Sequence, residues 1–361
     1  MHDLALYRKY RPKNFAEVLG QDHIVKILES SVKTNKVSHA YLFVGSRGTG
    51  KTSVARIFAE SIGVSANDLY EIDAASNRGI EDIKLLRDGV RVLPFDSKYK
   101  VYIIDEVHML SKDAWGAFLK TLEEPPKHVI FILATTELHK VPETIISRCQ
   151  VFTFKKASEA VLKKMLLEMA KSEGFEMDAG SAEVLAILAD GSFRDGLGEL
   201  QKVLNFSHPT PALPLARGGG NTKQKITRAD VEKITGAPKT VLVNDFISAI
   251  AEKDLDKGIS AIRKASEANL DMKLYFKLII QKFRMAIILR YAPKLEKEMA
   301  GDLSETDLKF LQDLIKTDKE GLLRSPALAV LLEAYQNMDN AFIAELPLEL
   351  ALVKIIGEKQ K

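Results

Sequence analysis

The first 155 residues alternate short apolar runs with segments whose apolar positions recur at helical spacing. This alternation predicts βαβ units, in which a parallel sheet is covered by helices on both faces. From Lys51, the apolar residues Val54, Phe58 and Ile62 recur at a spacing of four, which predicts a helix with one face against the sheet. The apolar runs predict five strands, over residues 41–44, 70–72, 101–104, 129–133 and 151–154.

The pattern changes after about residue 158, where the strand signal disappears and helical spacing continues. We therefore predict an α/β domain over residues 1–155, a helical lid over 156–237 and a third, helical domain over 238–361. Helices are predicted over residues 162–169, 182–188, 197–204, 271–291, 303–315 and 327–344.

One segment interrupts the helical lid. Residues 208–221 read HPTPALPLARGGGN, with three prolines and three consecutive glycines. Such a segment forms neither a helix nor a central strand. We predict an exposed, mobile insertion near residues 206–224, and a specific binding loop is the alternative.

The composition is that of an ordinary globular protein, with 46% hydrophobic and 28% charged residues. Without an apolar run of the roughly 18 to 20 residues that a membrane helix needs, or a basic and then apolar leader, we expect a cytoplasmic protein with no membrane partner. Cys149 is the sole cysteine, so an internal disulfide and a Cys-based zinc cage are both excluded. We expect no zinc.

The net charge of +3 is too small to predict nucleic-acid binding by itself. The whole surplus lies within residues 1–155, and residues 78–100 are richer in basic than in acidic side chains. From charge alone, a solvated helix face is the favoured interpretation of such a run. The basic residues of this segment are Arg78, Lys84, Arg87, Arg91, Lys98 and Lys100.

Residues 45–52 read GSRGTGKT and match G-x-x-x-x-G-K-[ST], between a predicted strand and a predicted helix. Glycines allow backbone N–H groups to turn inward around phosphates, at a helix N-terminus that favours anions. Lys51 is expected to reach the β- and γ-phosphates, and the Thr52 hydroxyl to bind Mg²⁺. The predicted phosphate-binding residues are Gly45, Ser46, Arg47, Gly48, Thr49, Gly50, Lys51, Thr52 and Ser53.

A second motif is an apolar strand that ends in Asp105 and Glu106. Asp105 at the strand tip can hold Mg²⁺, and Glu106 can polarise the water that attacks the γ-phosphate. Together with the phosphate loop, the pair predicts ATP hydrolysis. The buried strand before Thr135 and Thr136 ends near the expected γ-phosphate, whereas Arg148 is by itself only an exposed arginine.

Several further runs occur in a characteristic order: YRKYRP at 7–12, HAYLF at 39–43, EIDAAS at 71–76, DEVHMLS at 105–111, LKTLEEPP at 119–126, ATT at 134–136, SRC at 147–149 and GSFRD at 191–195. Over residues 4 to about 204 their order and spacing resemble the gamma/tau family, the AAA+ subunits of the bacterial DNA polymerase III clamp loader. The last 120 residues fit the helical collar of that family, an oligomerisation domain, by length and helicity only.

The resemblance implies roles for several residues. Thr136, or its neighbour Thr135, matches sensor 1, and Arg194 matches sensor 2 in the lid. Arg148 matches the arginine finger that serves the ATP of a neighbouring subunit. The adenine pocket is expected to include Arg8, Arg11, Pro12 and Val18, and the helix that begins near Arg78 is expected to line the duplex chamber with Lys84 and Arg87.

The resemblance also implies a function. Clamp loaders use ATP to open a sliding clamp and place it on primed DNA during replication. The expected partners are delta, delta prime and further gamma/tau copies, the beta sliding clamp, and primer-template DNA. The family is catalogued under DNA-directed DNA polymerase (nucleotidyltransferase) activity through its holoenzyme, but we expect no polymerase site in this chain.

The sequence departs from the family in three places. Only residues 63–69 occupy the position of the four-cysteine zinc module. Gly196 and Gly198 each cost about 1 kcal/mol relative to alanine in a helix, which predicts a looser sensor 2 helix. The chain ends at Lys361 without the long tau extension, so a gamma-like form is expected. A branch-migration helicase or another AAA+ remodeller, and the clamp-loader stator, are the alternatives.

Overall fold

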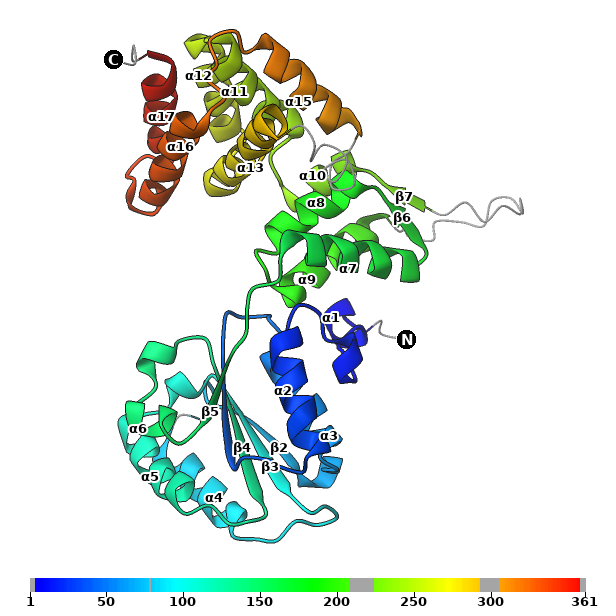
Figure 1. Cartoon of the computed structure of the whole chain (residues 1–361), viewed down its shortest axis with the longest axis vertical. Coiled ribbons are helices and arrows are strands. Elements are labelled where there is room, and N and C mark those ends of the chain that lie inside the picture. The colour runs from blue at the N-terminus through cyan, green and yellow to red at the C-terminus, as the bar shows by residue number, and fades with distance from the viewer. Residues whose placement is uncertain (1–3, 78, 208–223, 293–304, 358–361) are drawn as a thin grey trace, which may run out of the picture. The chain divides into compact units, whose positions relative to one another are not determined.

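The computed structural model describes residues 4–77, 79–207, 224–292 and 305–357 (Figure 1). Its contacts divide the chain into two compact units. The first comprises Met1–Leu162 and Ala189–Gly198, and the second comprises Lys163–Leu188 and Glu199–Lys361. The second unit holds most of both predicted helical domains, so the boundary between lid and collar stays a prediction.

The first unit is built on a five-stranded parallel sheet with the order β2-β3-β4-β1-β5. Its central strands are buried because apolar residues occupy both of their faces. All five strands lie where the apolar runs predicted them, so the predicted fold class is confirmed. The strands are β1 (Ala40–Val44), β2 (Leu69–Asp73), β3 (Lys100–Asp105), β4 (Val129–Thr135) and β5 (Gln150–Thr153).

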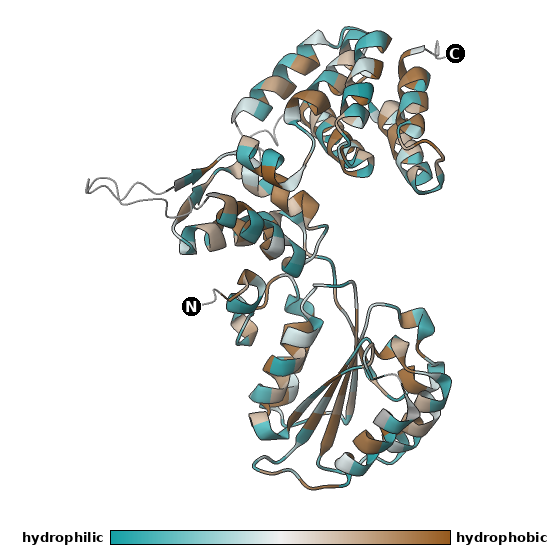
Figure 2. Cartoon of the chain, turned by 180° about the vertical axis from the view of Figure 1, so that it is seen from behind, coloured by the Kyte–Doolittle hydropathy of each residue, from teal (hydrophilic) through white to brown (hydrophobic). Residues whose placement is uncertain are grey.

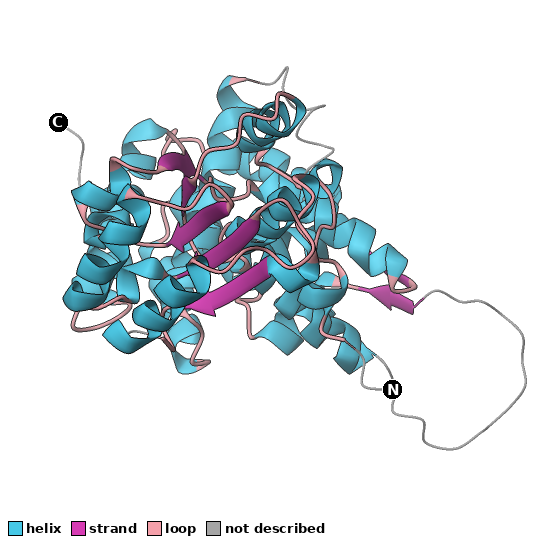
Figure 3. Ribbon diagram, turned by 90° about the horizontal axis from the view of Figure 1, so that it is seen from below, coloured by secondary structure: helices cyan, strands magenta, loops and turns pink. Residues whose placement is uncertain are grey.

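Helices cover both faces of this sheet (Figures 1 and 3). Because side chains alternate along a strand, Tyr41 and Phe43 pack with α2 and α3 on one face, while Leu42 packs with α4 and α5 on the other. The apolar side chains of the sheet thus form two cores, and Figure 2 shows brown strands between helices that carry both teal and brown residues. The helices of this unit are α1 (Leu6–Lys9), α2 (Asp22–Lys33), α3 (Lys51–Ser61), α4 (Ile80–Val90), α5 (Lys112–Glu123) and α6 (Glu143–Ile146).

The second unit is mainly helical, with a core that includes the fully buried Phe246, Phe276 and Phe283. The predicted helix over residues 327–344 is wrong at its end, because α16 stops at Asn337 and a single 3₁₀ turn follows. Its helices are α8 (Ala179–Leu188), α10 (Arg228–Thr235), α11 (Thr240–Glu252), α12 (Leu255–Glu267), α13 (Met272–Tyr291), α15 (Glu305–Thr317), α16 (Ser325–Asn337) and α17 (Leu346–Gly357), while α7 (Glu159–Ser172) and α9 (Phe193–Ser207) each begin in the first unit.

Two short strands in the second unit were not predicted. β6 (Phe175–Met177) and β7 (Gln224–Ile226) pair in parallel, so the expectation that no strand follows residue 158 is wrong. A strand of three residues is too short for its alternation to stand out from helical spacing. The expected Pro/Gly-rich insertion, residues 208–221, lies outside the described residues.

No helix among the described residues is long and apolar enough to cross a membrane.

Candidate nucleotide-binding site

The loop between β1 and α3 has the backbone that a phosphate loop requires. Gly48 has a φ of 73°, and a Cβ at this position would lie only 1.9 Å from Ser192 Oγ. A Cβ at Gly45 would lie 2.6 Å from the carbonyl oxygen of Phe154. Only glycine fits at both positions, because neighbouring segments approach the loop backbone so closely.

Lys51 occupies the first turn of α3, and its side chain is held inside this loop. The ammonium donates hydrogen bonds to the carbonyl oxygens of Gly45 at 2.7 Å and Ser46 at 3.0 Å. Lys51 is only 6% exposed, and this burial lowers its pKa, although nearby Glu106 and Asp105 oppose the shift. A cation in this position is placed to meet phosphate oxygens that enter the loop.

Thr52 and Asp105 bring two oxygen ligands together from distant parts of the sequence. The Thr52 hydroxyl donates to Asp105 Oδ2 at 2.7 Å, which joins the start of α3 to the tip of β3. Mg²⁺ prefers oxygen ligands and usually takes few from the protein, so this pair fits Mg²⁺. In the described part of the chain, no group of three or more His, Cys, Asp or Glu side chains could hold a metal. The expected absence of zinc stays a prediction.

Glu106 follows Asp105 in a left-handed backbone conformation, with a φ of 49°. Its Oε2 accepts a hydrogen bond from the Thr136 hydroxyl at 3.1 Å. The neighbouring Thr135 is fully buried, and its hydroxyl lies 3.0 Å from Nδ1 of His108. Of the two threonines proposed for sensor 1, the one in contact with Glu106 is therefore Thr136.

Arg194 lies beside the phosphate loop, at the start of α9. The backbone N–H of Phe193 donates to the carbonyl oxygen of Gly48 at 3.0 Å, which fixes the first turn of the helix against the loop. α9 continues through Gly196 and Gly198, and the expectation that these glycines loosen the helix stays a prediction.

A cavity of about 430 Å³ in the first unit is lined by Arg8, Arg11 and Arg56. Burial lowers the pKa of Arg11, and the positive charges of Arg56 and Arg194 lower it further. Arg56 also forms an ion pair with Glu71. This concentration of positive charge favours an anionic ligand.

Two of these three arginines, Arg8 and Arg11, were expected at the adenine pocket, and Arg56 was missed. Arg56 lies on the less buried face of α3, with Thr52 and Glu60, so the helical pattern gave no signal that marked it. Val18 packs against the core between the sheet and α2–α3, and Pro12 is half-buried.

Arg148 does not join the site of its own chain. One guanidinium nitrogen lies 2.7 Å from Glu123 Oε1, and another donates to the carbonyl oxygen of Thr144 at 2.7 Å. Both of these partners belong to α5 and α6, on the sheet face opposite α3 (Figure 1). Sequence reasoning missed Glu123, although it lies in the LEEPP run.

The proposed DNA-contacting residues are only partly described. Arg78 lies outside the described residues, whereas Lys84 is exposed on α4 and Arg87 is half-buried. The Arg87 guanidinium lies 3.7 Å from the Asp88 carboxylate. The two described basic residues are thus accessible at least in part.

Comparison with solved structures identifies the fold. The Holliday junction branch migration motor RuvB of Thermotoga maritima matches with a TM-score of 0.50 and 20% sequence identity, over 73% of this chain and 86% of that one. At such low identity the likeness shows the fold alone. The fold and the phosphate loop together define a P-loop protein of the AAA+ class.

Comparison with curated sequences identifies the family. The DNA polymerase III subunit tau of Bacillus subtilis is 39% identical over 81% of this chain, and the gamma/tau subunit of Mycoplasma genitalium is 34% identical over 96%. The gamma subunit of Buchnera aphidicola is 32% identical over 81% of this chain and 80% of its own length. The chain belongs to the gamma/tau subunit family of DNA polymerase III.

The family model of the DNA polymerase III delta subunit also matches, at residues 20–73 and 63–158. The chain spans 53% of the length of the B. subtilis relative and 57% of the M. genitalium relative.

Proposed function

We propose that this chain is an ATP-dependent clamp-loader subunit of the DNA polymerase III holoenzyme. In this proposal it binds ATP with Mg²⁺ and uses hydrolysis to load the beta sliding clamp onto primed DNA during replication. The observation that carries the proposal is a set of two side-chain hydrogen bonds beside the phosphate loop, between Thr52 and Asp105 and between Thr136 and Glu106. We propose the clamp and primed DNA as substrates because the chain belongs to the gamma/tau family.

Each residue of the site has a distinct part in this chemistry. The N–H groups of the loop and the ammonium of Lys51 bind the phosphates. Thr52 and Asp105 would hold Mg²⁺, which would neutralise phosphate charge when bound. Glu106 orients the attacking water and accepts its proton, and Thr136 fixes the Glu106 carboxylate. Arg194 and the cavity of Arg8, Arg11 and Arg56 add positive charge for the rest of the nucleotide.

The test separates binding from hydrolysis. Lys51→Ala is expected to abolish binding of a fluorescent ATP analogue, because it removes the buried cation. Glu106→Gln is expected to bind normally and to lose turnover, since an amide cannot accept the proton of the water. ATP hydrolysis by the wild type should rise with clamp and primed DNA. Unchanged nucleotide binding by the Lys51 variant would contradict the assignment of the phosphate loop.

Arg148 belongs in this proposal as a residue that acts on the ATP of the adjacent subunit. Its described partners lie on α5 and α6, away from the phosphate loop of its own chain. In well-studied nucleotide hydrolases such an arginine contributes about 10³ to 10⁵ in rate. Mixing Arg148→Ala subunits with Lys51→Ala subunits should restore hydrolysis at mixed interfaces. If the mixture forms hetero-oligomers and stays inactive, Arg148 does not act on the adjacent subunit and is an ordinary surface arginine.

Two exposed apolar patches suit the protein partners that we propose. One comprises Leu85 of α4 and, in the segment that follows the helix, Val92, Leu93 and Phe95, each of which is more than 60% exposed. Large apolar side chains gathered at the surface mark interaction sites. We assign this patch to the beta sliding clamp.

The second patch lies on and beside α17 in the second unit, where Phe342, Leu350 and Val353 are exposed. We assign it to delta, delta prime and further gamma/tau copies, in a collar. Of the basic residues on α4, Lys84 and Arg87 are proposed to contact the phosphates of primer-template DNA, without base readout.

The alternatives are distinguished by the same assay. A branch-migration motor responds to a Holliday junction rather than to clamp with primed DNA, and a stator hydrolyses no ATP. The 39% identity to a tau subunit, against 20% to RuvB, favours the clamp loader. The polymerase activity under which the family is catalogued belongs, in this proposal, to other chains of the holoenzyme.

A further inference from the structure

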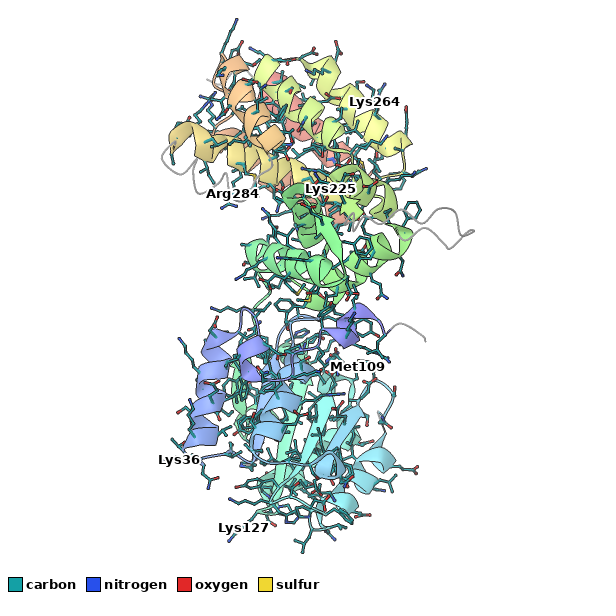
Figure 4. The ribbon with its side chains drawn as sticks, turned by 90° about the vertical axis from the view of Figure 1, so that its right-hand side faces the viewer. Lys36, Met109, Lys127, Lys225, Lys264 and Arg284 are labelled. Carbon is teal, nitrogen blue, oxygen red and sulfur yellow. The ribbon has the colours of Figure 1, made fainter. Side chains whose placement is uncertain are left out.

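His108 is a buried histidine beside the proposed catalytic glutamate. It lies in the 3₁₀ turn Val107–Met109 directly after Glu106, and its side chain is only 6% exposed. Figure 4 labels its neighbour Met109. None of the roles assigned above uses this imidazole.

Both nitrogens of the ring have polar partners. Nδ1 lies 3.0 Å from the Thr135 hydroxyl and 3.5 Å from Oε2 of Glu106. On the other side of the ring, Nε2 lies 3.2 Å from Oε1 of Glu137. His108 therefore bridges Glu106, at the tip of β3, to the residues that follow β4.

The far side of this bridge is itself fixed. The backbone N–H of Glu137 donates to the Thr135 hydroxyl at 3.0 Å, and the Glu137 carboxylate accepts from Lys140 at 2.8 Å. The hydrogen bond from Lys140 lowers the pKa of Glu137, which keeps the carboxylate charged. Glu137 and Thr135 thus hold the imidazole ring in one orientation.

We propose that His108 is a positioning residue that holds the Glu106 carboxylate in the orientation needed for water activation. The inference rests on the proposed ATP hydrolysis. Glu106 is 31% exposed, so its side chain needs fixed neighbours, and its Oε2 lies 3.1 Å from the Thr136 hydroxyl and 3.5 Å from Nδ1 of His108. A general base must lie within about 2.6 to 3.2 Å of the water oxygen whose proton it accepts. A misplacement of about 1 Å costs about 10²-fold in rate.

Two amide substitutions separate this role from simple space filling. His108→Asn places an amide near the position of Nδ1 and retains a contact with Glu106. His108→Gln places it near Nε2, which retains the contact with Glu137 and loses the one with Glu106. His139→Ala is the matched control, because that ring is 74% exposed and contacts Glu137 at 3.6 Å from the solvent side.

Steady-state ATP hydrolysis of the assembled complex, with clamp and primed DNA, gives the readout. We expect His108→Gln to lower kcat about 10- to 100-fold with KM and analogue affinity within about twofold. His108→Asn should retain kcat within about threefold, and His139→Ala should match the wild type. Rates are divided by the number of sites that bind the ATP analogue, so misfolded protein does not enter the comparison.

Equal loss of kcat in the Asn and Gln variants, or wild-type kcat in both, overturns the proposal. Glu106→Gln is measured alongside. If Glu106→Gln hydrolyses ATP normally, the proposed function of Glu106 fails. If it is inactive while His108→Gln is fully active, only the role of His108 fails.

Discussion

Asp68 anchors the segment that carries the exposed apolar patch after α4. The residue is fully buried, and its carboxylate accepts hydrogen bonds from three consecutive backbone N–H groups. Oδ1 receives the N–H of Phe95 at 2.5 Å, and Oδ2 receives those of Asp96 and Ser97 at 2.8 Å each. We predict that Asp68→Asn destabilises the first unit and loosens this segment.

The expected loss in free energy of unfolding follows from the backbone N–H donors that lose their acceptor in Asp68→Asn. An asparagine retains one oxygen, so its NH₂ group faces the N–H of Phe95 or those of Asp96 and Ser97. A buried donor left without a partner costs about 1 to 3 kcal/mol. The remaining bonds lose the charge that strengthens them about twofold. Together these losses predict a free energy of unfolding lower by about 2 to 4 kcal/mol.

The contribution of Asp68 to the stability of the first unit changes with pH in a defined direction. Burial raises the pKa of Asp68, but the backbone N–H groups outweigh this and lower it from 3.8 to about 2. Because the pKa is lower in the folded state, the stabilisation is complete above pH 3.8 and is lost as the pH falls through about 2. The difference between wild type and Asp68→Asn should be constant from pH 5 to about 8 and shrink below pH 4.

Urea unfolding followed by tryptophan fluorescence measures the effect. Trp115 is the only tryptophan of the chain and lies in the core of the first unit, at 7% exposure. The control is Asp96→Asn, since that exposed carboxylate accepts only from the Asn67 amide in the described structure and should change stability by less than about 0.5 kcal/mol. An unfolding midpoint for Asp68→Asn equal to that of Asp96→Asn would refute the reasoning.

Three further predictions concern stability, DNA and metal. Gly116→Ala should stabilise the first unit by up to about 1 kcal/mol, because a Cβ on this exposed part of α5 meets nothing within 4 Å. Gly258→Ala should destabilise the second unit, because its Cβ would lie 2.5 Å from a buried leucine of α17. Thermal unfolding that reverses this order contradicts both predictions. Charge reversal at Lys84 and Arg87 should weaken primed-DNA binding by the assembled complex at every sequence and reduce its salt dependence, and full retention of affinity excludes the contact. Elemental analysis after dialysis against a mild chelator should find no stoichiometric zinc, and one zinc per chain would show the expectation to be wrong.

The features predicted correctly from the sequence are those in which neighbouring residues carry the signal. The strand 129–133 reads as one apolar run, and the phosphate loop is a contiguous motif whose glycines the backbone needs. β4 extends two residues further, to Thr135, because its last residues pair with β1. The pattern within one segment was therefore enough for the five strands of the first unit and for the phosphate loop, whereas α1, α2, α5 and α6 were not located from the sequence.

The features missed depend on contacts between distant residues. Glu71 and Arg56 are 15 positions apart, and nothing local marks them as partners. His108 was visible in the DEVHMLS run, but its role depends on Glu137, which lies beyond a whole helix and strand. The pair of Arg148 and Glu123 likewise joins two recognised motifs whose contact neither motif specifies.

The contacts of Gly48 connect nucleotide binding to the helix that carries Arg194. The segment Ala189–Gly198 lies in the predicted lid, yet it groups with the first unit because it packs on the phosphate loop and on the chain after β5. The carbonyl oxygen of Gly48 accepts the N–H of Phe193, and the carbonyl oxygen of Gly191 accepts the N–H of Ala157. The peptide plane that holds the carbonyl oxygen of Gly48 also holds the N–H of Thr49, a group of the phosphate loop. We therefore expect nucleotide binding to shift the first turn of α9 through this hydrogen bond to the Gly48 carbonyl, in addition to any contact that Arg194 makes with the nucleotide.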